Sequence, residues 1–330
     1  MKLGSLKDGG RDGTLIVVSR DLARAVRASA IAPTLQRALE DWSNVAPRLN
    51  ALSEALHANA APEAFALELA TLAAPLPRAY EFVDGSAYLP HVERVRRARG
   101  AEVPESFYTD PLMYQATSAG FYGPTDPILA LSEEWGIDLE AEVVVVTDDV
   151  PMGVSPADAA NHIQLIGLVN DVSLRNLIPG ELAKGFGFLQ SKPRSALSPV
   201  FVTPDELGDA WSGSKLNLPM RTWINGRWFG GAECGVDMQF SFAELVAHAA
   251  KTRPLGAGTL VGSGTIANED TSKGASCLAE QRTVETLRDG KPSTPFLKFG
   301  DSVRIEITDA SGASLFGAIE QRVTSQSATR

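Results

Sequence analysis

Acidic residues alternate along one apolar stretch of the chain, GIDLEAEVVVV, residues 136–146. Alternate side chains of a β-strand share a face, so Asp138, Glu140 and Glu142 should point the same way. Two carboxylates about 4 Å apart repel each other by roughly 4 kcal/mol at an effective dielectric constant near 20, so the group needs a proton, cationic side chains or a metal ion. The valines that follow indicate a buried strand, although an exposed edge with solvated glutamates would show the same letters. We interpret the stretch as part of a metal site.

A further acidic residue, Asp171, stands at the end of another apolar run, in LIGLVNDVSLRNL, with Arg175 four residues on. Taken alone, such an aspartate is more often a turn or capping residue. Together with Glu140 and Glu142 it forms a set of hard oxygen ligands of the kind that Mg²⁺, Mn²⁺ and Ca²⁺ select, whereas the sequence shows no set of cysteines and histidines for zinc. The carboxylates therefore predict a divalent-cation site, with Mg²⁺ first and Mn²⁺ or Ca²⁺ as alternatives.

The composition is that of a globular protein with a small-molecule or protein partner. The 330 residues are 44% hydrophobic and 21% charged, which allows a large core in two domains or one large one. The net charge of −10 opposes binding to nucleic acid, and no stretch approaches the ~20 apolar residues of a membrane span. Cys234 and Cys277 have no CxxC partner, which fits reduced thiols, so we expect a cytoplasmic protein.

The order of the segments indicates two parts. Residues 2–21 contain two strand-like pieces around a Gly/Asp turn, and residues 32–42 and 46–56 show apolar residues at helical spacing after prolines suited to helix starts. The Ala/Pro-rich stretch LAAPLPRAYEF then connects a small N-terminal αβ domain, residues 1–77, to a second domain, residues 78–330.

Strands dominate the second part. Apolar or alternating runs bounded by Gly, Asp, Asn and Pro outnumber the helical segments. The pair Asn225-Gly226 between RTWI and RWF is a strong signal of a type I′ hairpin, and TDASGA marks a second hairpin. This pattern predicts a β-rich α+β domain rather than a regular βαβ alternation.

Six segments carry, in order, a resemblance to a known family: FYTDPLMYQATSAGFYGP, GIDLEAEVVVVTDDVP, VNDVSLRNL, SKPRSALSPVFVTPDEL, FSFAELVAHAAKTRPLGAGTLVGSGTIAN and GDSVRIEI. Over roughly residues 78–325 the chain resembles the fumarylacetoacetate hydrolase (fumarylacetoacetase) superfamily, and the first 75 residues or so resemble the shorter N-terminal domain of bacterial members. The resemblance implies a mixed β-sandwich roll of the fumarylacetoacetase C-terminal type, a homodimer, and a divalent cation at the mouth of the roll.

The resemblance also implies a set of metal ligands. Glu140, Glu142 and Asp171 match the metal carboxylates of the family. Asp110 in YTDPLMYQ matches a fourth carboxylate of fumarylacetoacetases across a gap of two residues. We therefore expect four acidic side chains around one cation.

Other matching positions imply contacts with the substrate. Arg175 and Lys192 match basic residues near the substrate, and Thr265 in GSGTIAN matches the threonine of the Gly-Thr loop. Lys192 lies between two apolar runs, where a lysine needs an anionic partner. Glu280 in GASCLAE aligns with the glutamate that orients the catalytic histidine of fumarylacetoacetases.

That catalytic histidine is replaced here by Gln115, which cannot accept a proton as a base. His91 in AYLPHVERV resembles the lid histidine of the smaller acylpyruvase-type members, whose glutamate partner follows three positions later. Arg94 occupies that position here, and Glu93 is adjacent, so the partner of His91 stays open. A histidine is suited to proton transfer near neutral pH, and we expect His91 to be the base, although a partly exposed structural histidine is an equal alternative.

Together these features imply a metal-dependent hydrolase that cleaves a carbon-carbon bond in a 1,3-diketo acid. The leading substrate is fumarylacetoacetate, split to fumarate and acetoacetate in aromatic amino-acid (tyrosine) degradation. The cation would act as a Lewis acid, with Lys192 adding positive field and Arg175 holding a substrate carboxylate. The alternatives are an acylpyruvate hydrolase, a β-keto acid decarboxylase, a 2-oxo-alkenoate hydratase, or a non-catalytic metal-binding homologue in which Gln115 marks lost activity.

Overall fold

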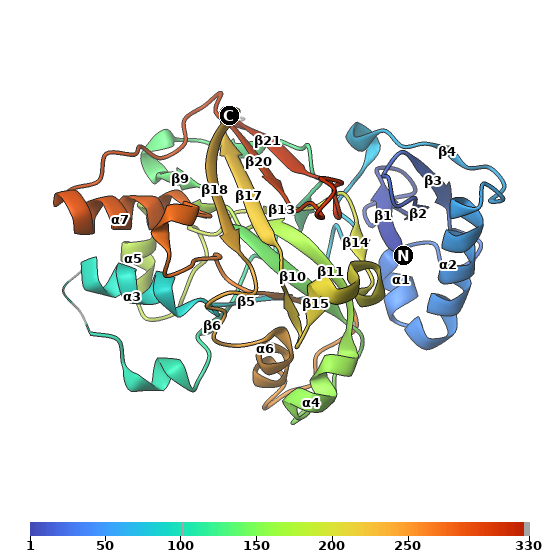
Figure 1. Ribbon diagram of the computed structural model, residues 1–330, viewed down its shortest axis with the longest axis horizontal. Coiled ribbons are helices and arrows are strands. Elements are labelled where there is room, and N and C mark those ends of the chain that lie inside the picture. The colour runs from blue at the N-terminus through green and yellow to red at the C-terminus, as the bar shows by residue number, and fades with distance from the viewer. Residues whose placement is uncertain (99, 101, 327–330) are drawn as a thin grey trace.

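The N-terminal segment forms a small αβ unit whose sheet continues into the rest of the molecule. The computed structural model describes residues 1–98, 100 and 102–326. Strands β1 to β4 pair antiparallel in chain order, and helices α1 and α2 lie beside them at the right of Figure 1. The bounds are β1 Lys2–Leu6, β2 Thr14–Val18, β3 Arg24–Arg27, β4 Phe65–Ala66, α1 Leu35–Leu39 and α2 Trp42–His57.

One helix start differs from its prediction. Helix α2 begins at Trp42 and contains Pro47, so the expectation of a helix start at this proline is wrong. A proline inside a helix removes one backbone hydrogen bond. Burial of Val45, Leu49 and Leu56 along one face of α2 offsets that loss.

A twelve-stranded sheet runs through both parts of the chain. Strand β1 pairs with β14, and the order from there is β14-β11-β10-β19-β5-β6, while β13 joins β11 to β7. Strands β10 and β11 are long and antiparallel, whereas β5 is parallel to β19. The bounds are β5 Phe82–Gly85, β6 Met113–Gln115, β7 Phe121–Tyr122, β10 Ala141–Thr147, β11 Ile163–Asn170, β13 Ser195–Leu197, β14 Phe201–Val202 and β19 Leu260–Gly262.

A second sheet of five strands, in the order β18-β17-β20-β21-β8, completes the roll. Asn225 and Gly226 join β17 to β18 with φ values of 54° and 70°, the positive values that a type I′ turn requires, so the predicted hairpin is confirmed. Two short pairs, β9 with β12 and β15 with β16, lie outside both sheets. The bounds are β8 Ile128–Ala130, β9 Ile137–Asp138, β12 Ser173–Leu174, β15 Trp211–Ser212, β16 Lys215–Leu216, β17 Pro219–Ile224, β18 Arg227–Glu233, β20 Ser302–Glu306 and β21 Ile319–Ser325.

The hydrophobic core is divided by strand β10. Val143 and Val145 belong to the core inside the roll, whereas Val144 and Val146 belong to a second core, which includes the buried residues of helices α1 and α2. This alternation is the period of two that the sequence predicted for a buried strand. The α+β class and the mixed β-sandwich roll are confirmed, whereas the boundary between residues 77 and 78 stays a proposal.

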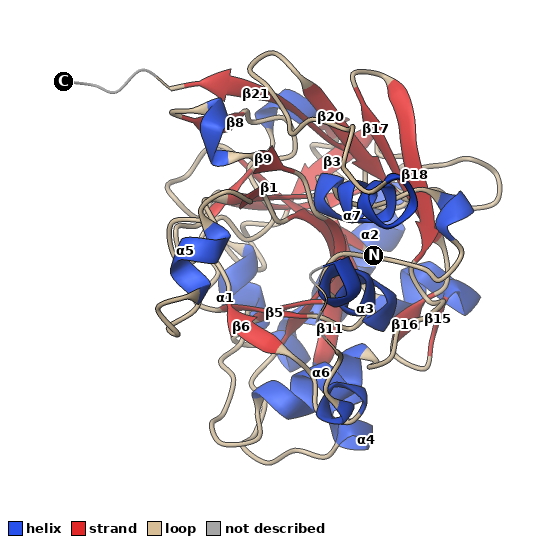
Figure 2. Cartoon of the chain, turned by 90° about the vertical axis from the view of Figure 1, so that its left-hand side faces the viewer, coloured by secondary structure: helices blue, strands red, loops and turns tan. Residues whose placement is uncertain are grey.

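Helices α3 and α7 lie side by side at one end of the roll, in front in Figure 2. Ser241 and Glu244 form a capping box at the start of α6. The bounds are α3 Leu89–Ala98, α4 Pro156–Ala159, α5 Ile178–Leu182, α6 Phe242–Ala249 and α7 Leu278–Asp289. None of the helices in the described ranges is both long and apolar enough to span a bilayer.

Candidate active site

Three buried carboxylates converge where strands of the large sheet end. Asp84 comes from β5, Glu142 from β10, and Asp171 directly follows β11. One oxygen from each lies within 4.8 Å of the others. Sequence analysis missed Asp84, although its signal was present: like Asp171, it ends a short apolar run, here EFVD.

Asp84 is held in place by the glycine-rich loop that follows β19. Its Oδ1 accepts a hydrogen bond of 3.0 Å from the backbone N–H of Gly264. Gly264 has a φ of 74°, and a Cβ there would lie 2.3 Å from the carbonyl oxygen of Gly85, so glycine is required. Burial, and then the charge of Asp171, raise the pKa of Asp84 to about 7.

Glu142 is the most unusual member of the cluster. It is fully buried, and neither of its carboxylate oxygens has a hydrogen-bond partner among the described residues. Burial raises its pKa well above the usual value, and the charges of Asp84, Glu140 and Asp171 raise it further. A buried carboxylate needs a partner, and a cation among these oxygens would supply one.

Glu140, two residues earlier, has the opposite environment. Its Oε1 accepts from Nη2 of Arg175 at 2.6 Å, and its Oε2 accepts from Nζ of Lys192 at 2.5 Å. Burial alone would raise the pKa of Glu140, but Arg175 and Lys192 hold it well below its usual range. Both oxygens are therefore engaged by cationic side chains in this structure.

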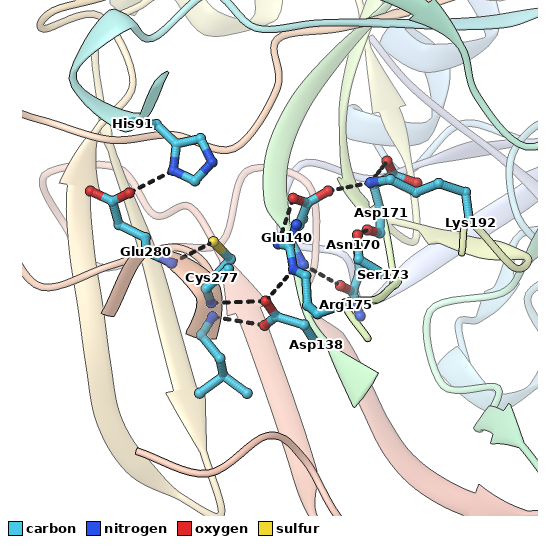
Figure 3. A network of polar contacts seen from close by, with 12 residues as sticks. His91, Asp138, Glu140, Asn170, Asp171, Ser173, Arg175, Lys192, Cys277 and Glu280 are labelled. Carbon is cyan, nitrogen blue, oxygen red and sulfur yellow. Dashed lines mark hydrogen bonds and ion pairs between the residues drawn. The ribbon is translucent and has the colours of Figure 1, made fainter. Parts of the chain in front are cut away.

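Arg175 connects Glu140 to the start of helix α7 (Figure 3). Its Nε donates to Oδ2 of Asp138 at 2.7 Å. Asp138 also accepts from the backbone N–H groups of Leu278 at 2.7 Å and Ala279 at 2.9 Å, the first residues of α7. A carboxylate at a helix N-terminus is favourable because unpaired N–H groups point toward it. Asp138 is therefore a structural residue that anchors α7 beside the cluster.

Asp171 collects hydrogen bonds from three side chains. Its Oδ1 accepts from the Ser195 hydroxyl at 2.6 Å, and its Oδ2 accepts from Lys192 and from the Tyr114 hydroxyl, each at 2.7 Å. Tyr114 was missed from the sequence. It neighbours Gln115 in β6, and because adjacent side chains of a strand point to opposite faces, only one of the two can face the cluster.

The structure does not bring Gln115 or Asp110 to the cluster. Gln115 is exposed and donates to Glu81 at 2.8 Å, on the face opposite to Tyr114. The Asp110 side chain is 69% exposed and lies 3.6 Å from Nδ1 of His248. Asp84, rather than Asp110, supplies the additional carboxylate beside Glu142.

The charges of the cluster show whether a dication fits. Five buried carboxylates lie here, and two cations of the described residues, the partly buried Arg175 and the buried Lys192, contact them. The five are Asp84, Asp138, Glu140, Glu142 and Asp171. Asp84 and Glu142 contact neither cation. Hard oxygen donors with excess negative charge suit Mg²⁺ or Mn²⁺, so Asp84, Glu142 and Asp171 fit a divalent cation.

A histidine and a glutamate form a second pair near the cluster. Nδ1 of His91, on α3, lies 2.5 Å from Oε2 of Glu280, on α7. Arg94 donates to Oε1 of Glu280 at 2.5 Å and to the carbonyl oxygen of Asn268. Burial alone would raise the pKa of Glu280, but His91 and Arg94 hold it below its usual value. In Figure 3 the second ring nitrogen of His91 is turned toward the side of Glu140.

This geometry connects predictions that the sequence left separate. The partner of His91 is Glu280, which lies 189 positions away, whereas neighbouring Glu93 accepts instead from the Tyr108 hydroxyl. Thr265 is buried in the loop that holds Asp84, one residue after Gly264. Lys192 is 7% exposed and contacts the two carboxylates already described.

Comparison with known proteins identifies the class to which this fold and site belong. Residues 81–324 match the family model described as fumarylacetoacetate (FAA) hydrolase C-terminal. Residues 1–78 match the model described as fumarylacetoacetase N-terminal domain 2. The chain belongs to the fumarylacetoacetate hydrolase family.

Individual relatives are distant. The chain is 28% identical to "Oxaloacetate tautomerase fahd2, mitochondrial" of Xenopus laevis over 209 residues, which are 62% of this chain and 57% of that protein. It is 26% identical to "2,4-didehydro-3-deoxy-L-rhamnonate hydrolase" of Sphingomonas sp. (strain SKA58) over 202 residues, 60% of this chain and 62% of that protein. The match therefore spans less than two thirds of either relative.

A solved structure shares the whole fold. Maleylpyruvate hydrolase from Sphingobium sp. SYK-6, in complex with manganese(II) ion and pyruvate, superposes with a TM-score of 0.66 at 17% identity. The superposition covers 98% of this chain and 99% of that one. At this identity the likeness establishes the fold alone.

Proposed function

We propose that the protein is a divalent-cation-dependent enzyme that hydrolyses a carbon-carbon bond in a 1,3-diketo acid, with fumarylacetoacetate as the leading substrate. The observation that carries the proposal is the buried Glu142 carboxylate, without a partner among the described residues, beside Asp84 and Asp171. Such a carboxylate suits a cation, and the His91–Glu280 pair supplies an acid-base group nearby. Mg²⁺ and Mn²⁺ are the cations we expect.

The carboxylates and the basic residues have separate roles in this proposal. Asp84, Glu142 and Asp171 would hold the cation, which supplies Lewis-acid polarisation of a dicarbonyl when bound. Glu140 shares Lys192 with Asp171 and so keeps the ammonium group at the edge of the site, where its positive charge stabilises a developing enolate.

Arg175 and Thr265 are proposed to bind the substrate. Asp138 and Glu140 engage Nε and Nη2 of Arg175, so Nη1 is the nitrogen that we assign to a substrate carboxylate. The buried Thr265 hydroxyl adjoins the loop that holds Asp84 and would donate to a substrate oxygen.

His91 is proposed as the general base. In the proposed tautomer Nδ1–H donates a hydrogen bond to Glu280, so Nε2 carries no proton and can take one from water. The resulting hydroxide attacks the carbonyl carbon, the carbon-carbon bond breaks, and His91 then returns the proton to the carbon of the leaving enolate. Glu280 stays ionised throughout because Arg94 and His91 both hold its pKa low.

Keto-enol tautomerisation is the second candidate. It moves one proton between a carbon and the enol oxygen and breaks no carbon-carbon bond, so His91 could take the proton from one atom and return it to the other. A relative bears the name oxaloacetate tautomerase. The third candidate, from another class, is a metal-binding homologue without activity. Purified protein with Mg²⁺ or Mn²⁺ is assayed against fumarylacetoacetate, an acylpyruvate and oxaloacetate. Cleavage supports the first proposal, interconversion of oxaloacetate tautomers alone supports the second, and no turnover with the metal bound supports the third.

Substitution of His91 tests the base. We expect His91→Gln to lower kcat by about 10²–10⁴-fold, the usual contribution of a general base. His162→Gln is the matched control, because Nδ1 of His162 pairs with Asp148 at 2.6 Å in the same manner outside the site. Unchanged kcat in His91→Gln, measured by single-turnover kinetics, would show that another group is the base.

The homodimer and the cytoplasmic location stay predictions.

A further inference from the structure

One carboxylate outside the cluster holds the turn that precedes Lys192. Glu181, at the end of α5, is 9% exposed. Its oxygens accept from the backbone N–H groups of Leu189 at 3.1 Å, Gln190 at 2.7 Å and Ser191 at 3.1 Å, and from the Ser191 hydroxyl at 2.5 Å. Burial alone would raise the pKa of Glu181, but these hydrogen bonds lower it to about 2, so the group is an anion at neutral pH.

The rest of the segment between α5 and this turn has little packing. Phe186 is fully exposed and Leu189 is 81% exposed. Gly185 and Gly187 both have positive φ, and a Cβ built at either would meet no atom within 4 Å. Only the Phe188 ring turns inward, where it packs edge-on against Tyr114. A segment with so few apolar contacts depends on its polar anchor for a defined position.

The turn ends directly at the site. Ser191 accepts at its carbonyl oxygen from the N–H of Leu174, 2.8 Å away, which joins the turn to the strand that leads to Arg175. The next residue is Lys192, whose Nζ bridges Glu140 and Asp171. The path from the Glu181 carboxylate to the ammonium group therefore contains one fixed turn and one side chain.

We propose that Glu181 is a positioning residue that holds Lys192 in the site by binding the Leu189–Ser191 turn. The position of the lysine follows from the contacts alone, whereas its consequence for turnover rests on the proposed function. Glutamine at position 181 would offer one oxygen acceptor in place of two, and its NH₂ group would face N–H donors. Glu181→Gln should therefore release the turn and with it the ammonium group.

The chain contains a matched control in Glu285. This carboxylate, on α7, accepts from the N–H groups of Ser293 at 2.6 Å and Thr294 at 2.8 Å, and from the Thr294 hydroxyl at 2.5 Å. As for Glu181, burial alone would raise the pKa of Glu285, but its hydrogen bonds lower that pKa to about 2. The segment that it holds contains none of the proposed site residues. Glu285→Gln thus removes an equivalent carboxylate and should leave the position of Lys192 unchanged.

Chemical labelling of lysines measures the position of Lys192 without relying on activity. The full-length protein and both variants are treated briefly with acetic anhydride, and acetylation of each lysine is quantified by mass spectrometry. Lys2 is the internal control for folding, because it is 1% exposed and its Nζ donates to the carbonyl oxygens of Ser314 and Leu315. We expect Lys192 labelling to rise about tenfold in Glu181→Gln, equivalent to about 1.4 kcal/mol, while Lys2 labelling stays constant.

Three outcomes would overturn the proposal. The first is that Lys192 in Glu181→Gln is acetylated no more than in the wild type while Lys2 stays protected. The second is that Lys192 acetylation rises equally in Glu285→Gln. The third is that acetylation of Lys2 and of Lys192 rises together in a Ser191→Ala variant. Ser191→Ala removes one donor and keeps the carboxylate, so it serves if Glu181→Gln does not fold, and it should raise Lys192 labelling alone by a smaller factor. Assays of kcat then separate the two ideas: if the wild type turns over no diketo acid, the proposed function fails while the labelling result still stands.

A double-mutant cycle separates positioning from general stability. If Glu181 acts through Lys192, Glu181→Gln should lower kcat in the wild type and have no further effect in a Lys192→Met background. KM should change less than kcat, because Lys192 is assigned to a charge that develops during the reaction. Equal losses in both backgrounds would contradict the inference.

Discussion

Glu140 and Glu142 are the same residue type, two positions apart, and differ in almost every physical respect. Glu140 has a guanidinium on one oxygen and an ammonium on the other, and its pKa is held low. Glu142 is equally buried, has no partner among the described residues, and its pKa is raised. The comparison teaches that burial of a carboxylate does not by itself define a ligand. The difference lies in the side chains that other segments bring to each, since Arg175 follows β12 and Lys192 precedes β13.

The two sides of the cluster therefore depend on different partners. On the Glu140 side, Arg175 and Lys192 belong to the fold, so the ion pairs form whenever the chain folds. On the Glu142 side, Asp84 and Glu142 contact no cationic side chain among the described residues, so an ion bound by them and Asp171 would complete the site. Substitutions on the first side should change stability, and those on the second should change cation affinity.

The largest effect is expected when an existing buried ion pair is broken. Glu140→Gln should lower the free energy of unfolding by about 3–5 kcal/mol, because Arg175 and Lys192 lose their shared anion. Urea denaturation of the cation-free protein measures the change. The control is Glu320→Gln, whose carboxylate is 62% exposed and pairs with Arg304, and which should cost less than about 1 kcal/mol. Equal effects for the two variants would show that the buried ion pairs of Glu140 contribute no more to the free energy of unfolding than the exposed pair does.

The next effect concerns the other glutamate. Glu142→Gln should weaken Mn²⁺ binding by about 100-fold, since loss of a ligand should cost at least as much as loss of a group that orients one. The same substitution should stabilise the cation-free protein by about 1 kcal/mol near neutral pH, because Glu142, whose pKa is raised, must take up a proton on folding and has no hydrogen-bond partner among the described residues. Isothermal titration calorimetry and urea denaturation give the two quantities. Unchanged Mn²⁺ affinity would place the cation elsewhere.

A pH titration distinguishes the two sides without mutation. The pKa values of Asp84, about 7, and of Glu142 are raised in the folded state, so the folded cation-free protein holds protons that the unfolded chain has released. The contribution of these two groups to the free energy of unfolding should therefore be fully present below about pH 4 and should be lost as the pH rises through 7. The shift of the Asp84 pKa from 3.8 to about 7, counted at half of the free energy that it implies, gives a loss of roughly 2 kcal/mol between about pH 4 and 8.

Glu140 contributes nothing to that slope. Its pKa is lowered, so its contribution is present above the unfolded pKa of about 4.5 and is lost only in acid. Saturating Mg²⁺ or Mn²⁺ should remove the slope between pH 5 and 8, because the ion stabilises the ionised carboxylates. Chemical denaturation at several pH values, with and without the cation, is the measurement. A cation-free protein whose stability rises over this range would contradict the assignment.

The smallest effect is expected at Asp110. Its carboxylate is exposed and 3.6 Å from His248, so Asp110→Asn should change the free energy of unfolding by less than about 0.5 kcal/mol. Its Mn²⁺ affinity should match that of the wild type in calorimetry. A large loss of affinity would indicate that Asp110 moves to the cluster when the cation binds.

Several features of the site could be predicted because they lie within short stretches of chain. The alternation of Glu140 and Glu142 with apolar residues correctly indicated a buried acidic stretch, although the structure divides it into β9 and β10 and leaves Glu140 between them. The Asn225-Gly226 turn follows from local backbone preferences. Asp171 at the end of an apolar run was also correctly placed among buried charges. Each of these depends on neighbours in sequence.

The misses share one cause, which is contact between distant segments. Asp84 joins the cluster because β5 pairs with β19, some 180 positions away, and Tyr114 joins it because β6 pairs with β5. His91 meets Glu280 only because α3 and α7 lie side by side. Gln115, which the resemblance matches to a catalytic histidine, is exposed and donates to Glu81, whereas its neighbour Tyr114 faces the cluster.

The amino-acid sequence alone determined that acidic side chains would be buried in one short apolar stretch and that the chain has the α+β class of a known family. Only the tertiary structure decided which of those carboxylates meet a cationic side chain and which do not. The physical reason is that strand period and turn chemistry are local properties, whereas the electrostatic energy of a buried charge depends on whatever the folded chain places within a few ångströms of it.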